Sequence, residues 1–95
     1  MIKRKTFDMY FKEVSDAFGI DILSDTRERD YTDARFVLYY LCRENNMRLK
    51  QIQEYLSDLG FSVSHTNIVY GHSHVSSLIN KDEEMKQLVD SIRNV

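Results

Sequence analysis

The stretch Ser64-His65-Thr66-Asn67-Ile68-Val69-Tyr70-Gly71 opens with four polar residues and runs directly into an apolar pattern of helical period. Ser64 suits the N-cap position, because its hydroxyl can accept a hydrogen bond from an amide of the first helical turn. The apolar side of the expected helix continues along the chain through Ile68, Val69, His72, Val75 and Leu78 or Ile79. We therefore predict a helix over residues 64–79 that begins with exposed hydrogen-bonding side chains.

A second amphipathic segment precedes this stretch. Residues 49–59 place Leu49, Ile52, Tyr55, Leu56 and Leu59 on one helical face, and Gly60 ends the pattern. Two helices joined by a short turn, the second with a polar start, are typical of a helix-turn-helix that binds duplex DNA. The sequence thus predicts a helix-turn-helix within residues 49–79.

Three further helices are expected around this pair. Apolar residues at helical spacing predict a helix over residues 6–18, capped by Thr6 and ended by Gly19. A similar pattern predicts a helix over residues 32–44, and a capping box at residues 80–83 predicts the start of a fifth. The chain contains no proline, which also favours helices. We predict an all-α fold of about five helices in a single domain spanning residues 1–95.

The predicted core draws on all five helices. It should include Phe11, Val14, Leu38, Leu41, Ile52, Leu56, Ile68, Val69 and Leu88.

Composition limits the classes of function. The 95 residues carry 13 basic and 15 acidic side chains, a net charge of −2, whereas nucleic-acid-binding proteins are usually basic on at least one face. No apolar run approaches the roughly 20 residues of a membrane span, and no apolar segment follows the charged N-terminus as in a secretion signal. The single cysteine fits a reducing compartment, so we expect a cytoplasmic protein with no membrane association.

The sequence offers little for catalysis or metal binding. No nucleophile stands beside a base and no pair of carboxylates forms a recognisable frame, so we expect no enzyme and no cofactor. His65, His72, His74 and Cys42 lack zinc-ligand spacing. Cys42 is more simply a small core residue, and His72 a buried, hydrogen-bonded one.

The order of the predicted elements resembles a known family, the C-terminal DNA-binding domain of the bacterial replication initiator DnaA, in the Trp-repressor-like superfamily. The family signature Asp-His-Thr-Thr-Val-Leu-His-Ala is matched by the run from Ser64 to Gly71. The Arg-rich loop of the family is similar to Arg27-Glu28-Arg29, and the helix after it to Ala34-Arg35 and Leu41-Cys42-Arg43-Glu44. Its Ser-Leu-x-x-Ile-Gly resembles Arg48-Leu49-Lys50-Gln51-Ile52-Gln53.

The resemblance covers roughly residues 6–95 and implies binding to short duplex repeats. The signature helix would enter the major groove, the Arg-rich loop would reach the neighbouring minor groove, and Arg35 and Lys50 would bind phosphate. Asparagine can pair with adenine through two hydrogen bonds, and a narrow minor groove attracts guanidinium groups. The DNA-binding residues implied are Arg27, Arg29, Arg35, Lys50, Ser64, His65, Thr66 and Asn67.

The chain also departs from the family pattern. The family has Arg-Asp before the histidine, where this chain has Val63-Ser64, and the stretch between Ile52 and His65 is longer here. No charged residue occurs from Ser64 to Ile79, and basic and acidic residues are six each between Arg27 and Ile79. The phosphate-binding motif G-x-x-x-x-G-K-[ST] is absent, so we expect no accompanying ATPase.

Two hypotheses follow. In the first, the chain is a non-enzymatic, sequence-specific DNA-binding module in replication or transcription control. In the second, it keeps the DnaA-like fold, has lost the DNA contacts and docks on another protein. A homodimer or a larger protein partner is compatible with either.

Overall fold

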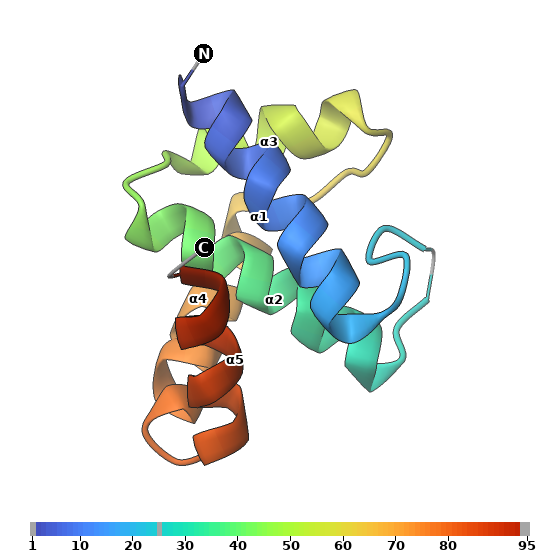
Figure 1. The fold of residues 1–95 in the computed structure, drawn as a ribbon. Helices are drawn as coiled ribbons and strands as arrows, with labels where there is room; N and C mark the ends of the chain where they lie inside the picture. Colours follow the sequence, from blue (N-terminus) through green and yellow to red (C-terminus); the bar gives the residue numbers. More distant parts are fainter. Residues whose placement is uncertain (1, 25, 94–95) are drawn as a thin grey trace.

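The computed structural model describes residues 2–24 and 26–93, which form five helices. In chain order these are α1 (Ile2–Phe18), α2 (Arg29–Glu44), α3 (Leu49–Asp58), α4 (His65–Ile79) and α5 (Glu83–Arg93) (Figure 1). No strand occurs among the described residues, and the predicted all-α fold of about five helices is confirmed. None of these helices has both the length and the apolar character needed to cross a membrane.

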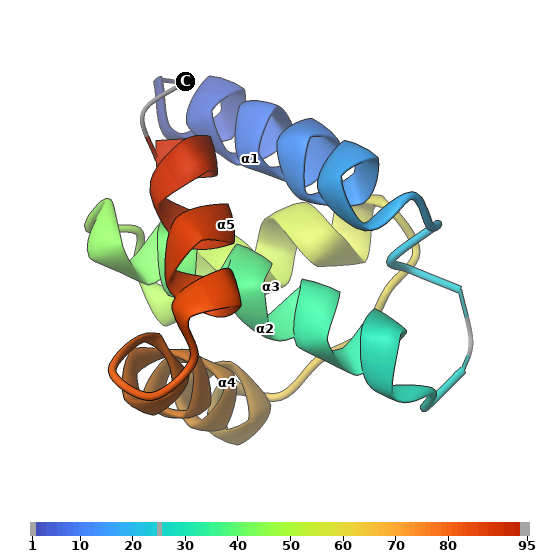
Figure 2. The same ribbon diagram turned by 60° about the horizontal axis from the view of Figure 1, so that its bottom comes forward.

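Helix α2 lies at the centre of the fold. Ala34 and every residue from 36 to 42 are buried, and the helix contacts all four others. In Figure 2, α1 lies on one side of α2 and α4 on the other. A helix that is apolar on every side must be covered on every side. The seven-residue apolar and aromatic run of α2 therefore fixes the positions of its neighbours.

Most of the predicted core is confirmed. Six of the nine residues are buried, namely Val14, Leu38, Leu41, Ile52, Leu56 and Ile68. Phe11 and Leu88 pack against this core with part of their surface exposed. The prediction for Val69 is wrong, since it is 47% exposed. Helix α4 buries Ile68, Gly71 and Val75, and Val69 points about 100° away from Ile68 around the helix axis.

The predicted ends of α2 and α3 are confirmed by left-handed residues. Asn46 has φ 63° and Gly60 has φ 83°. The amide of the next residue turns back to the helix in each case, from Met47 to the Cys42 carbonyl and from Phe61 to the Leu56 carbonyl, both at 3.0 Å. Each turn therefore satisfies a carbonyl at the end of its helix.

Two helices begin earlier than predicted. Helix α1 begins at Ile2, not at Thr6. Its first turns are held by the Lys3 ammonium, 2.7 Å from the Asn45 carbonyl, and by Arg4, which pairs with Asp58 at 2.9 Å. Helix α2 begins at Arg29 rather than at residue 32, and Asp30 in its first turn complements the positive end of the helix dipole.

The predicted capping box at residues 80–83 is also wrong. Asn80 is the C-cap of α4. The cap of α5 is Asp82, whose Oδ1 accepts from the amides of Glu84 at 3.0 Å and Met85 at 3.3 Å. A carboxylate satisfies two first-turn donors here, which leaves Asn80 free to end the preceding helix.

Candidate nucleic-acid interface

The first turn of α4 is built as predicted. Ser64 is the N-cap, and its Oγ accepts from the Asn67 amide at 3.1 Å. His65, Thr66 and Asn67 are exposed on this turn. The amides at a helix start carry the positive end of the helix dipole. This end of α4 therefore offers hydrogen-bonding side chains beside a partial positive charge.

Gly71 sets how closely α4 approaches α2. A Cβ at this position would lie 2.6 Å from Phe36 Cδ1 and 2.9 Å from Tyr39 Cδ2, inside van der Waals contact. The helices therefore pack closer here than any side chain at position 71 permits.

The turn between α3 and α4 is held from both sides. Gln53 on α3 donates through Nε2 to the Val63 carbonyl at 2.7 Å. On the other side, the guanidinium of Arg35 lies over the ring of Phe61, 5.0 Å from its centroid. These contacts fix the approach of the chain to Ser64.

The loop between α1 and α2 is bound to Arg35 as well. Arg35 donates through Nε to the Ile22 carbonyl at 2.6 Å, through Nη1 to the Thr26 carbonyl at 3.1 Å and through Nη2 to the Ser24 carbonyl. Arg27 follows these residues and is exposed. Arg35 is thus already engaged with the protein itself, while its predicted phosphate contact stays a prediction.

The loop, the turn and the start of α4 surround one depression of about 360 Å³. Four of the predicted residues line it: Arg27, Arg35, Ser64 and Asn67. The rest of its lining is Thr32, Phe36, Tyr39, Phe61, Ser62 and Val63. Burial raises the pKa of the Tyr39 phenol to about 12. The depression is therefore lined by two arginines, by the start of α4 and by three aromatic rings.

The remaining predicted residues lie around this depression or away from it. His65 and Thr66 share the α4 turn with Asn67 but do not line the hollow. Arg29 has an 88% exposed side chain whose Nε lies 3.5 Å from the Asp33 carboxylate. Lys50 is exposed in the first turn of α3, about 12 Å along that helix from the turn leading to α4.

Sequence reasoning missed the aromatic part of this site. Phe61 follows Gly60 in a segment without periodicity, and no local pattern shows that it meets Arg35. Phe36 and Tyr39 lie one turn apart on α2, but a helix apolar on every side does not show which residues meet α4.

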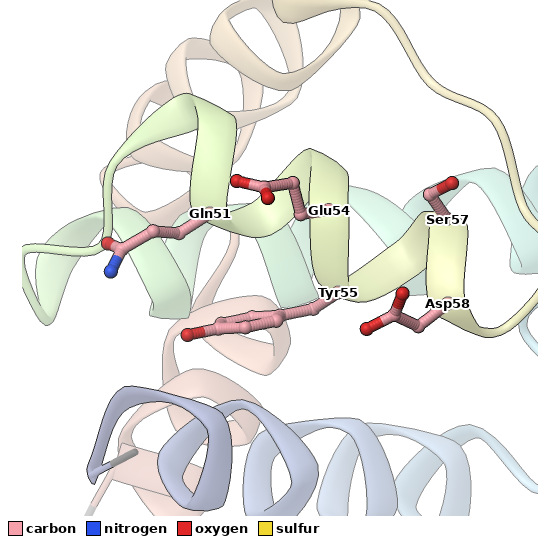
Figure 3. A pocket seen from close by; sticks show the side chains of 5 residues that line it. All are labelled: Gln51, Glu54, Tyr55, Ser57 and Asp58. Atoms are coloured by element: carbon pink, nitrogen blue, oxygen red, sulfur yellow. The ribbon is translucent and has the colours of Figure 1, made fainter.

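A second depression, of about 380 Å³, has a different character. It lies along α3 and is lined by Gln51, Glu54, Tyr55, Ser57 and Asp58 (Figure 3). Arg4 on α1 lies over the Tyr55 ring at 5.1 Å, and its charge is paired with Asp58 and with Asp8. The carboxylates of Glu54 and Asp58 in its lining would repel a phosphate backbone. By contrast, no carboxylate is among the described residues that line the Arg27 depression.

The histidines and the cysteine considered above as zinc ligands line neither depression. No group of three or more His, Cys, Asp or Glu among residues 2–24 and 26–93 is placed to hold a metal ion. Cys42 is buried in the core, and burial raises the pKa of its thiol. His72 is 31% exposed rather than buried, because its Nε2 reaches the exposed Glu44 carboxylate at 3.0 Å while its ring stacks on Tyr40.

The outer face of α4 is apolar in part. Tyr70 is 60% exposed and Val69 is 47% exposed. The Tyr70 ring stacks on His74 with centroids 5.9 Å apart, and both rings meet the edge or face of Phe36. This face lies beyond the polar first turn and bears no charge.

Among known proteins, the chromosomal replication initiator protein DnaA of Herpetosiphon aurantiacus is 32% identical to this chain over 95 residues. The match covers 96% of the chain but 19% of that protein, so the chain spans about a fifth of the relative's length. No protein-family model matches the sequence, and no solved structure matches it.

Proposed function

We propose that this chain is a non-enzymatic domain that binds duplex DNA in a sequence-specific manner, in replication or transcription control. The observation that carries the proposal is the shared depression, where Arg27 from one loop meets Ser64 and Asn67 at the start of α4. The similarity to part of a DnaA protein supports DNA as the partner and replication as the setting. The proposal implies a cytoplasmic location.

In this proposal α3 and α4 form a helix-turn-helix, and α4 enters the major groove with its N-terminal turn first. The Asn67 amide would pair with an adenine edge, and Thr66 offers a hydroxyl and a methyl group to a neighbouring base. His65 would reach a base edge from the same turn. All three side chains are exposed, as base reading requires.

Arg27 would then enter the adjacent minor groove. Its loop and the start of α4 line the same depression, so in this proposal one protein face would span two neighbouring grooves. Narrow A/T-rich minor grooves concentrate negative potential and attract guanidinium groups. Arg29 would flank that groove and Lys50 would bind phosphate.

The proposal is tested by selecting ligands from random duplexes at about 50 mM salt, where phosphate contacts act most strongly. The selected duplex is then titrated, with a fluorescent label, against the protein and against a His65→Ala/Thr66→Ala/Asn67→Ala variant. We expect the variant to remain folded by circular dichroism and to lose the sequence preference. A protein that binds no duplex at this salt concentration refutes the proposal.

A second candidate function rests on the exposed Val69 and Tyr70. An uncharged helix face with an exposed aromatic ring resembles a protein-docking surface, since Tyr is enriched in interfaces and charged residues are depleted at their centres. In this alternative α4 docks on another protein or on a second copy of the chain. Tyr70→Ser would then abolish the association, whereas DNA binding through residues 64–67 would survive it.

A further inference from the structure

The guanidinium of Arg35 stands where the two DNA-contacting segments of the proposed function meet. Its three nitrogens donate to the carbonyls of Ile22, Ser24 and Thr26 in the loop between α1 and α2. Its face lies on Phe61, in the turn that leads to α4. One side chain on the central helix therefore contacts both segments.

The other hydrogen bonds described in this loop are mostly local. The Ser24 amide bonds to the Asp21 carbonyl, the Thr26 amide to the Ser24 carbonyl, and the Glu28 amide to the Thr26 hydroxyl. Such bonds shape the loop but do not attach it to the helices. Besides Arg35, Thr32 on α2 reaches the end of the loop, through its amide to the Glu28 carbonyl at 3.0 Å and through its hydroxyl to the Arg27 carbonyl at a long 3.5 Å.

Arginine is suited to this role because its guanidinium is a rigid plane with five N–H donors. Three loop carbonyls receive donors from three different nitrogens, and the plane remains free to cover an aromatic ring. A lysine ammonium is a point charge and offers no such plane. A charge-preserving substitution therefore cannot reproduce the arrangement.

We propose that Arg35 is a positioning residue, which fixes the Arg27 loop relative to the first turn of α4 so that both fit neighbouring grooves of one duplex. This inference rests on the proposed function. This role takes the place of the phosphate contact expected for Arg35 from the sequence, because the guanidinium already binds the loop carbonyls and packs on Phe61. Arg35 acts on DNA only through the placement of Arg27.

The test is a double-mutant cycle between Arg35→Gln and Arg27→Ala, read by titration of the selected duplex at two salt concentrations. Each single substitution should weaken binding about tenfold, the scale of one good groove contact. The double variant should be no weaker than Arg27→Ala alone, with the same salt slope. Additive losses of about a hundredfold, with the slope reduced by a further 0.9 or so, would show that Arg35 binds phosphate directly and would overturn the inference.

Two further variants control for charge and for general destabilisation. Arg35→Lys should behave like Arg35→Gln, and full binding by the lysine variant would contradict the need for the planar fork. Arg43 is the matched control, since it also lies on α2 and donates to a carbonyl, that of Met47 at 2.9 Å, but at the far end of the helix. Arg43→Gln should leave duplex affinity unchanged.

A readout without DNA separates this inference from the proposed function. Trypsin cleavage after Arg27 should become several-fold faster in Arg35→Gln and Arg35→Lys but not in Arg43→Gln, while circular dichroism shows all three folded. Unchanged cleavage overturns the anchoring of the loop even if DNA binds. Faster cleavage in a protein that binds no duplex would keep the anchoring and reject the DNA role of both Arg35 and the chain.

Discussion

Replacing Gly71 with alanine tests the packing that places α4 on α2. The added methyl carbon would lie 2.6 Å from Phe36 Cδ1, 2.9 Å from Tyr39 Cδ2 and 3.1 Å from Phe36 Cγ. Two of these atoms sit near the base of the Phe36 ring, and Tyr39 is 1% exposed, so neither side chain can swing away at low cost. The helices must separate by several tenths of an ångström or the rings must tilt.

The expected free-energy change has two opposing parts. Overpacking a well-filled contact costs about 1–3 kcal/mol. Alanine is a better helix former than glycine by up to about 1 kcal/mol, which offsets part of that cost. We therefore expect Gly71→Ala to lower the free energy of unfolding by about 1 kcal/mol, or roughly 4–8 °C in melting temperature for a domain of this size. Displacement of α4 should also weaken duplex binding several-fold.

The measurement is urea unfolding followed by circular dichroism. The urea concentrations at the midpoint are compared between variants whose dependence of unfolding free energy on urea is the same. Ser73→Ala, at an exposed position of the same helix, isolates the propensity effect and should stabilise by a few tenths of a kcal/mol. Phe36→Leu should cost less in the Gly71→Ala background than in the original chain, because it removes the clashing ring. A Gly71→Ala variant that is instead more stable by about 1 kcal/mol would refute the steric account of the α2–α4 contact.

Three other predictions follow from the site. Arg27→Ala with Arg29→Ala should weaken duplex binding and shift the melting temperature little, because exposed residues seldom support the core; a large loss of stability with unchanged affinity would show a structural role. Asn67→Ala should relax base preference at one position, at a cost of about 1–3 kcal/mol in binding free energy. Lys50→Ala should instead weaken binding to all duplexes alike and reduce the salt slope by about 0.9; titrations of matched and mismatched duplexes measure both effects. The unfolded chain loses the Tyr39 proton near pH 10.0 and the folded chain holds it to about pH 12, so Tyr39 alone should lower the free energy of unfolding by about 1.4 kcal/mol per pH unit in this window. Urea unfolding at several pH values should show a slope shallower by this amount in Tyr39→Phe, while the buried Cys42 thiol still contributes its own slope; an unchanged slope would refute the assignment.

The periodic parts of the fold were predictable from the sequence. The 3.6-residue spacing of apolar residues located five helices, and Asn46 and Gly60 marked the ends of two of them. The errors fell where local patterns compete with tertiary contacts. Helix α1 extends to Ile2 because Lys3 and Arg4 find partners on distant segments, and no local signal reports those partners.

The buried side of a helix was harder to predict from the sequence than the helix itself. Ile68 and Val69 are both β-branched and adjacent, and the fold buries Ile68 on the face of α4 that also carries Gly71 and Val75. The same limit applies to the candidate site. The sequence indicated Ser64 as a cap and the exposure of residues 65–67, but a meeting of Arg27, Arg35 and Phe61 is a property of the three-dimensional fold.

The charge distribution has a consequence for how such a domain would work. With Arg35 committed to the loop, the cations placed to meet phosphate are Arg27, Arg29, Lys50 and also Arg48, the exposed N-cap residue of α3, so the salt slope should be about −3.6. Affinity would then fall roughly 150-fold between 50 and 200 mM salt. In the proposed function the α4 turn would contact bases through uncharged amide and hydroxyl groups, so it would add little to the binding of non-specific sequences. Binding would be weak for a single domain and selective for its sequence.

Useful occupancy then requires a second linked domain or a partner that raises the local concentration, because a tether adds avidity without adding charge. A head-to-tail fusion of two copies should therefore bind paired sites at least 100-fold more tightly than one copy binds a single site, and equal affinities would refute this account.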